Sequence, residues 1–96
     1  MSSIYFRGYI FIRLKKIGFE WKVVDKLKNL KSVEDDEDWM VTYATPVYGG
    51  WDVVVECSVT KKQELDKIMA YIRMDEEISK WIEETTTLVS NKPDYP

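Results

Sequence analysis

The sequence contains no histidine and a single cysteine, Cys57. Histidine is the commonest general base and metal ligand in proteins, so without it most hydrolase and metalloenzyme schemes would need less usual residues. One cysteine can form neither an intrachain disulfide nor a cysteine cluster for zinc. Because Cys57 lies at an alternating position of a β-branched run, we interpret it as a small buried hydrophobe. These features disfavour an enzyme and predict no metal and no cofactor.

The sequence also lacks a long apolar run. No stretch approaches the roughly 20 apolar residues that span a bilayer, and Arg7 and Arg13 interrupt the N-terminal stretch that a signal peptide would need. We therefore expect a cytoplasmic protein. A chain of 96 residues supports one core, so we predict a single domain over residues 1–90. The tail over 91–96 holds Pro93 and Pro96, and we expect it to be extended or disordered.

Positive charge is scarce outside the first third of the chain. Residues 1–31 hold eight Lys/Arg against two acids, whereas the rest holds six against fifteen. A basic segment can mark a nucleic-acid interface. We instead interpret it as the solvated side of a helix, because its lysines are spread along the segment, and we expect no direct contact with nucleic acid. These are Lys15, Lys16, Lys22, Lys26, Lys28 and Lys31.

The first third has the patterns of a strand and a helix. Residues 4–14 alternate with period two, which predicts a strand with both faces covered, one of them by another subunit. Residues 18–30 carry an apolar stripe at helical spacing, which predicts an amphipathic helix. One strand face holds Phe6, Gly8, Ile10, Ile12 and Leu14, the other holds Tyr5, Arg7, Tyr9, Phe11 and Arg13, and the helix stripe is Val23, Val24, Leu27 and Leu30.

The middle of the chain has the pattern of a hairpin. An acidic run over 34–38 predicts a solvated connection. Residues 39–44 then alternate as a strand, with Trp39, Val41 and Tyr43 on one face, and Pro46 should end it because proline cannot donate to a ladder. Gly49 and Gly50 predict the turn into a β-branched strand over 51–59.

The last third predicts a second helix and a last strand. Thr60 and Gln63 match a capping box, which predicts a helix that starts there and ends near Met74. We expect Met69 and Met74 to fill the core. A β-branched run predicts the final strand over 78–90. The apolar stripe of the helix is Leu65, Ile68, Met69 and Ile72.

The order of elements is therefore β-α-β-β-α-β. It predicts an α+β ferredoxin-like sandwich, in which a four-stranded antiparallel sheet carries both helices on one face. The other face would expose Tyr5, Tyr9 and Phe11 as part of an apolar patch too large for a monomer. We expect this face to form the interface of a homodimer.

Three segments give the chain a resemblance to the stand-alone ligand-sensing domain of the Lrp/AsnC regulators, also called the amino-acid-metabolism regulation domain. They are Val23–Glu34 in and after the first helix, the Gly-x-x-Asp turn and strand at Gly49–Val55, and Thr85–Val89 in the last strand. The resemblance covers nearly the whole chain. It departs from the family in its longer hairpin and in having no DNA-binding helix-turn-helix in front.

The resemblance implies a function in small-molecule sensing or in oligomerisation of a transcription regulator. Such domains form dimers and rings, and amino acids or related effectors bind near the Gly-x-x-Asp loop. Carried over by position, the ligand-binding candidates are Gly49, Gly50, Asp52, Thr85 and Thr87. Asp52 would meet an ammonium group and the threonines a carboxylate; alternatively, Asp52 caps the turn and the threonines reflect strand propensity.

Two other functions stay open. Small dimeric ferredoxin-like enzymes, such as monooxygenases and isomerases, place a cleft between helices and sheet, and here Tyr9, Arg13, Tyr43 and Asp52 would be the candidates. No spacing pairs a nucleophile with a base, which disfavours this reading. Alternatively, the chain is a structural partner that binds a DNA-binding homologue through its dimer face.

Overall fold

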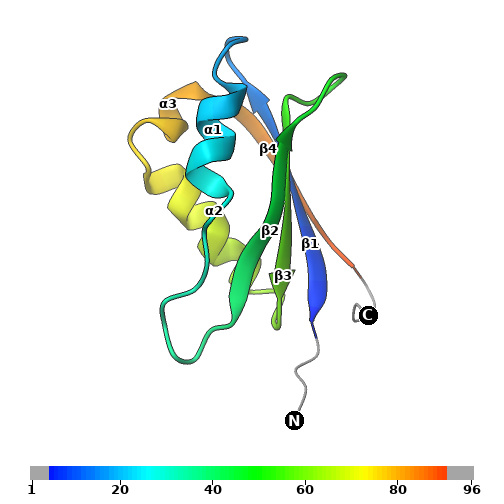
Figure 1. Ribbon diagram of the computed structural model, residues 1–96, viewed down its shortest axis with the longest axis vertical. Coiled ribbons are helices and arrows are strands. Elements are labelled where there is room, and N and C mark those ends of the chain that lie inside the picture. The colour runs from blue at the N-terminus through cyan, green and yellow to red at the C-terminus, as the bar shows by residue number, and fades with distance from the viewer. Residues whose placement is uncertain (1–4, 91–96) are drawn as a thin grey trace.

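The computed structural model describes residues 5–90, which fold into four strands and three helices (Figure 1). The predicted tail over 91–96 lies outside the described residues. No helix within residues 5–90 is long and apolar enough to cross a membrane. The elements are β1 (Phe6–Leu14), α1 (Glu20–Leu27), β2 (Trp39–Pro46), β3 (Val53–Val59), α2 (Glu64–Met74), α3 (Ile78–Trp81) and β4 (Ile82–Val89).

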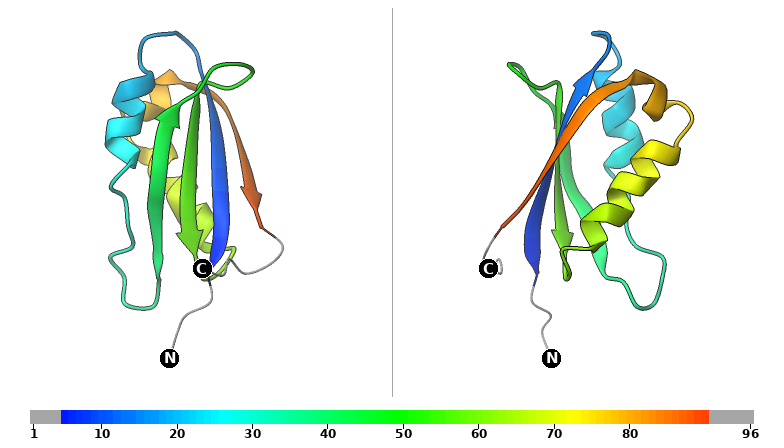
Figure 2. Two further views of the ribbon diagram at one scale, coloured as in Figure 1. Left: turned by 45° about the vertical axis from the view of Figure 1, so that its right-hand side comes forward. Right: turned by 180° about the vertical axis from the view of Figure 1, so that it is seen from behind.

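The strands form one antiparallel sheet in the order β2-β3-β1-β4. β1 pairs with β3 at the centre of the sheet and with the edge strand β4 on its other side, so the first and last thirds of the chain lie side by side. The helices lie against one face and leave the opposite face bare (Figure 2). The predicted ferredoxin-like α+β fold is therefore confirmed.

The core lies between the sheet and the helices. The predicted alternation of β1 is confirmed, since Ile10 and Ile12 are fully buried and their neighbours are half-buried. Gly8 lies on the same face and leaves room for Leu65 of α2, whose Cδ1 would be 3.3 Å from a Cβ at this position. Cys57 is buried, and burial, with a smaller effect of the Glu56 charge, raises the pKa of its thiol to about 12. Its thiol is therefore unreactive at neutral pH.

The predicted alternation of β2 is wrong beyond Val41. Val41 pairs with Cys57, but Tyr43 pairs with Glu56, so the register shifts at Thr42. This β-bulge places Tyr43 on the bare face with 59% of its surface exposed, while Val41 stays in the core. The Thr42 hydroxyl donates to the backbone oxygen of Glu56 at 3.1 Å and to its Oε1 at 3.0 Å.

The last strand begins four residues later than predicted, because Ile78–Trp81 forms α3. The Asp75 carboxylate starts this turn by accepting the backbone N–H groups of Glu77 and Ile78, both at 2.9 Å. Ile78 is fully buried and so holds the turn against the core. The strand propensity of this segment is therefore outweighed by the Asp75 cap and by the burial of Ile78.

Two predictions at α2 are also wrong. The side chain of Gln63 makes no capping hydrogen bond. Instead Glu64, one residue later, is 3% exposed and accepts the N–H of Thr60 at 2.7 Å and its hydroxyl at 3.0 Å. Met74 is 81% exposed rather than core filler, whereas Met69 is buried as predicted.

Candidate functional site

Asp52 anchors the β2–β3 hairpin to the end of β1. One carboxylate oxygen accepts the Leu14 N–H at 2.7 Å, and the Asp52 N–H donates to the carbonyl of Ile12 at 2.9 Å. The Asp52 carbonyl also accepts the Val47 N–H at 2.9 Å and closes the hairpin. These bonds give Asp52 the structural role of a turn cap.

A cleft opens between this hairpin and the start of α1. It has a volume of about 540 Å³, and Gly49 and Asp52 belong to its lining. Gly49 has a φ of 136°, which a residue with a side chain rarely adopts, so the glycine is required for the turn. We call it the hairpin cleft; the other residues that line it are Ile17, Glu20, Trp21, Pro46, Val47 and Tyr48.

Gly50 binds Arg13 through its backbone. Its carbonyl accepts the Arg13 Nε–H at 3.1 Å and an Nη2–H at 2.9 Å. The same guanidinium stacks 4.6 Å from the ring centre of Trp51 and pairs with Glu84. Arg13 therefore links the hairpin, β1 and β4 on the bare face of the sheet.

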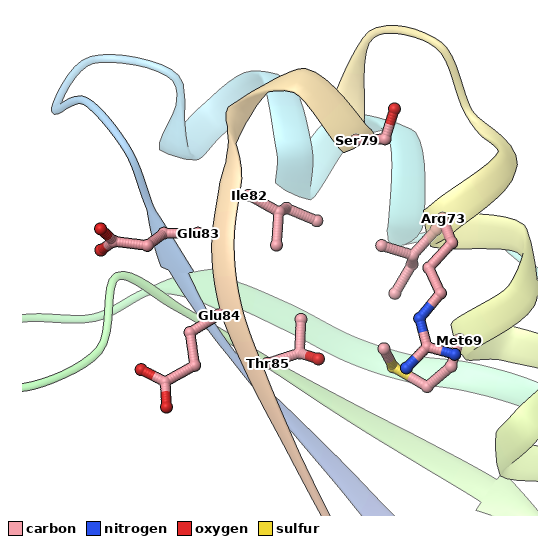
Figure 3. Close-up of a pocket in the computed structure, with 8 residues that line it drawn as sticks. Met69, Arg73, Ser79, Ile82, Glu83, Glu84 and Thr85 are labelled. Carbon is pink, nitrogen blue, oxygen red and sulfur yellow. The ribbon is translucent and has the colours of Figure 1, made fainter.

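A second cavity lies between β4 and the end of α2, with a volume of about 240 Å³ (Figure 3). We call it the β4 cavity. The Arg73 guanidinium extends over it, while the carboxylates of Glu83 and Glu84 point away from it. Arg73 forms no ion pair within residues 5–90. The remaining lining residues are Met69, Ile72, Ser79, Ile82 and Thr85.

The structure separates the ligand-binding candidates. Thr85 lies in the β4 cavity, whereas Gly49 and Asp52 lie in the hairpin cleft. Thr87 pairs with Ile10 farther along β4 and lines neither cavity. Neither of these two cavities therefore joins the Asp52 carboxylate to the β4 threonines.

Sequence reasoning missed Arg73. It stands in the last turn of α2, where a basic residue is ordinary because it complements the helix dipole. Only the packing of α2 against β4 places its charge over a mainly apolar cavity beside a threonine hydroxyl. The one signal available in the sequence was that Arg73 follows the buried Ile72 directly. This position places it next to the apolar stripe of α2 rather than opposite it.

The four residues weighed for an enzyme fall into two groups. Tyr9 and Tyr43 pair with the same residue, Glu56, from its two sides, on the bare face of the sheet. Asp52 is engaged with the backbone of β1, and Arg13 with the hairpin. Of these four residues, Asp52 alone lines one of the two cavities described above.

The bare face of the sheet carries several large, exposed apolar side chains. Met40, Tyr43 and Leu88 are 48%, 59% and 52% exposed, and they come from β2 and β4 at the two edges. Phe11 lies near the centre with its ring 6.0 Å from that of Trp51. Tyr9 also lies on this face, and Tyr5 at its end donates a hydrogen bond to Asp38 at 2.8 Å.

Charged side chains on this face are paired, Arg7 with Glu56 near its middle and Arg13 with Glu84 near one end. Arg7 contacts Glu56 at 3.3 Å, and Thr42 donates to the same carboxylate at 3.0 Å. An apolar surface with a paired charge at its centre is typical of protein interfaces, in which polar groups are satisfied before they are covered.

Comparison with known proteins shows the fold. No protein-family model matches the chain, and no curated protein matches it. The crystal structure of FFRP-DM1 is similar at 22% identity with a TM-score of 0.59, over 88% of this chain and 97% of that one. The hypothetical protein PHS023 from Pyrococcus horikoshii is similar at 22% identity with a TM-score of 0.60, over 88% of each chain. At this identity the two structures place the chain in their common ferredoxin-like fold.

Proposed function

We propose that this chain is a self-associating, effector-sensing module of the kind found in Lrp/AsnC regulators. Its fold is shared with FFRP-DM1, and FFRP regulators are of the Lrp/AsnC type. The observation that carries the proposal is the bare apolar face of the sheet, which spans all four strands.

The association follows from the cost of leaving this face in water. Burial of apolar surface stabilises a complex by about 25 cal/mol per Å² before the costs of association are subtracted. Two copies related by a twofold axis would cover each other's aromatic residues with the same surface. A full-length regulator with the same fold would offer an equivalent face, so mixed dimers with such a partner belong to the same proposal.

Light scattering after size exclusion tests the association. The wild type should elute as a dimer, and Leu88→Lys or Tyr43→Lys should give a monomer, because each buries an unpaired charge at the interface. Ile17→Lys is the matched control: Ile17 is 91% exposed and lines the hairpin cleft, away from the sheet face. A wild type that stays monomeric at about 1 mM, where even a Kd of about 1 mM gives substantial dimer, would refute the proposal.

The effector should be a small carboxylate with an apolar side chain, such as an amino acid. In the β4 cavity, Arg73 supplies a charge without an ion-pair partner among the described residues and Thr85 a hydroxyl. Guanidinium groups bind carboxylates through paired hydrogen bonds. Met69, Ile72 and Ile82 would contact the apolar part.

Calorimetric titration with the twenty amino acids tests the effector. At least one should bind, and Arg73→Gln should weaken it at least tenfold because the carboxylate loses a charged partner. Lys31→Gln removes the same charge from an exposed position outside the cavity and should leave the affinity unchanged. No heat with any amino acid, using the dimer, would rule out the amino-acid version.

A further inference from the structure

A third cavity lies where the β1–α1 loop meets α3, at the upper end of the molecule in Figure 1. It has a volume of about 210 Å³. Its lining consists of two aromatic rings and three lysines, with no acid: Phe19, Trp81, Lys15, Lys16 and Lys80. We call it the lysine cavity.

The aromatic wall of the lysine cavity is fixed by packing. Phe19 and Trp81 stack with ring centres 4.6 Å apart and planes 6° from parallel. The Lys15 N–H donates to the Trp81 carbonyl at 2.7 Å, which ties the loop to the end of α3. Both rings pack against the core cluster and are half-buried, so they form a rigid surface that still contacts solvent.

The charge at this place is positive and uncompensated within the described residues. Lys22 of α1 lies 5.4 Å from the Phe19 ring centre and 5.9 Å from that of Trp81, so it adds a fourth ammonium group beside the cavity. None of Lys15, Lys16, Lys22 and Lys80 forms an ion pair within residues 5–90. Like charges gathered without acids repel, and a bound anion would relieve that repulsion.

We propose that the lysine cavity binds the phosphate and base of a nucleotide. Ammonium groups bind phosphate as point charges, and aromatic rings stack on any nucleobase. The volume is below the roughly 300–1,000 Å³ of sites that enclose a whole drug-sized ligand, so one nucleotide unit would sit with part of it outside. The same chemistry is offered by a free mononucleotide and by one nucleotide of a single strand.

Amide chemical-shift titration with AMP, adenosine, inorganic phosphate and a short oligothymidylate tests the proposal. AMP should shift the resonances of Lys15, Lys16, Lys80 and Trp81, and should bind more tightly than either adenosine or phosphate, because it engages both lysines and rings. Equal affinity for phosphate and AMP would overturn the role of the rings. No shifts at about 10 mM AMP, which would nearly saturate a site with a Kd of about 1 mM, would overturn the proposal.

Two charge variants make the test specific. Lys16→Gln combined with Lys80→Gln should weaken the affinity for AMP at least tenfold and reduce the salt dependence of binding. Both side chains are exposed, so their loss leaves the fold intact. Lys31→Gln combined with Lys61→Gln lowers the charge equally outside the cavity. An equal loss in this control pair would mean nonspecific attraction and would overturn the site. If the oligothymidylate binds more tightly per nucleotide than AMP, the ligand of this cavity is a nucleotide of a single strand and not a free mononucleotide.

Discussion

Glu64 is the buried residue whose charge matters most to the fold. Its Oε1 accepts the N–H of Thr60 at 2.7 Å and of Lys61 at 3.2 Å, and its Oε2 accepts the N–H of Asp38 at 2.8 Å. One carboxylate thereby holds the turn before α2 against the loop before β2. Burial alone would raise the pKa of Glu64, but together these backbone donors lower it below its usual value.

Glu64→Gln should therefore destabilise the protein by about 2 kcal/mol. The glutamine can keep one acceptor oxygen, but its NH₂ group then faces the N–H of Asp38 or Thr60, and a donor stays unpaired. Urea unfolding at pH 7 gives the free energy. Glu76→Gln, at an exposed position, is the control and should change it by less than about 0.5 kcal/mol.

The same carboxylate predicts a pH dependence. Because the folded pKa of Glu64 is lower than its unfolded value of about 4.3, the unfolded chain binds the proton more readily. The stabilisation is complete above that value and is lost as the pH falls through the folded pKa. The stability difference between wild type and Glu64→Gln should shrink over this window. A difference that stays constant down to about pH 2 would contradict the role of the charge.

Substitutions at Asp52 test whether its carboxylate has a structural role or serves only to bind a ligand. Asp52→Ala should cost about 1–2 kcal/mol because the Leu14 N–H loses its acceptor. Asp52→Asn keeps an oxygen in place and should cost less than half of that. Both are measured by urea unfolding without any ligand. If asparagine costs as much as alanine, the negative charge and not the hydrogen bond is what the hairpin requires.

At the scale of elements, the sequence predicted what depends on periodicity and missed what depends on single contacts. The faces of β1 and the stripe of α2 follow from spacing alone, and both are as predicted. The β-bulge at Thr42 depends on a hydroxyl bond to Glu56, and α3 on the Asp75 cap. Neither contact changes the hydrophobic periodicity of the sequence, so the sequence predicts a continuous strand at both places.

Two substitutions in β2 test the bulge. Val41→Ala should cost about 1–3 kcal/mol, because Val41 is 4% exposed and leaves a cavity. Tyr43→Ser should cost less than about 0.5 kcal/mol per folded chain, because its side chain is on the bare face. Unfolding at two protein concentrations separates any loss of association, which depends on concentration, from a loss of packing. If both substitutions lower the free energy of unfolding equally, Tyr43 lies in the core as Val41 does, and β2 alternates without a bulge.

At the scale of the whole molecule, the candidate site could be predicted only in part. The Gly49 turn and the bare sheet face follow from residue types and strand order. The β4 cavity does not, since it exists only where α2 crosses β4 and brings Arg73 near Thr85. The lysine cavity likewise joins Lys15 and Lys16 to Lys80, which are far apart in the sequence.

Association through the sheet face makes thermal stability depend on concentration. The midpoint of unfolding should rise by about 3 °C for each tenfold rise in protein concentration, because only the folded chain has the face to bury. Differential scanning calorimetry measures it. Leu88→Lys should remove the dependence, whereas Ile17→Lys should keep it. A wild-type midpoint that is independent of concentration would contradict a dimer that dissociates on unfolding.

The Thr42 bulge and Pro46 also make the two edges of the sheet unequal. On β2, the bulge twists the edge and the proline removes a donor near its end, so another chain cannot extend the ladder there. On β4 the register shift against β1 lies at the start of the strand, at Glu83, and from Glu84 to Val89 the edge runs without proline and without a further charge. Strand addition is therefore directed to β4, whether it leads to productive assembly or to aggregation. Fusions or labels that must not disturb strand addition belong at the β2 edge.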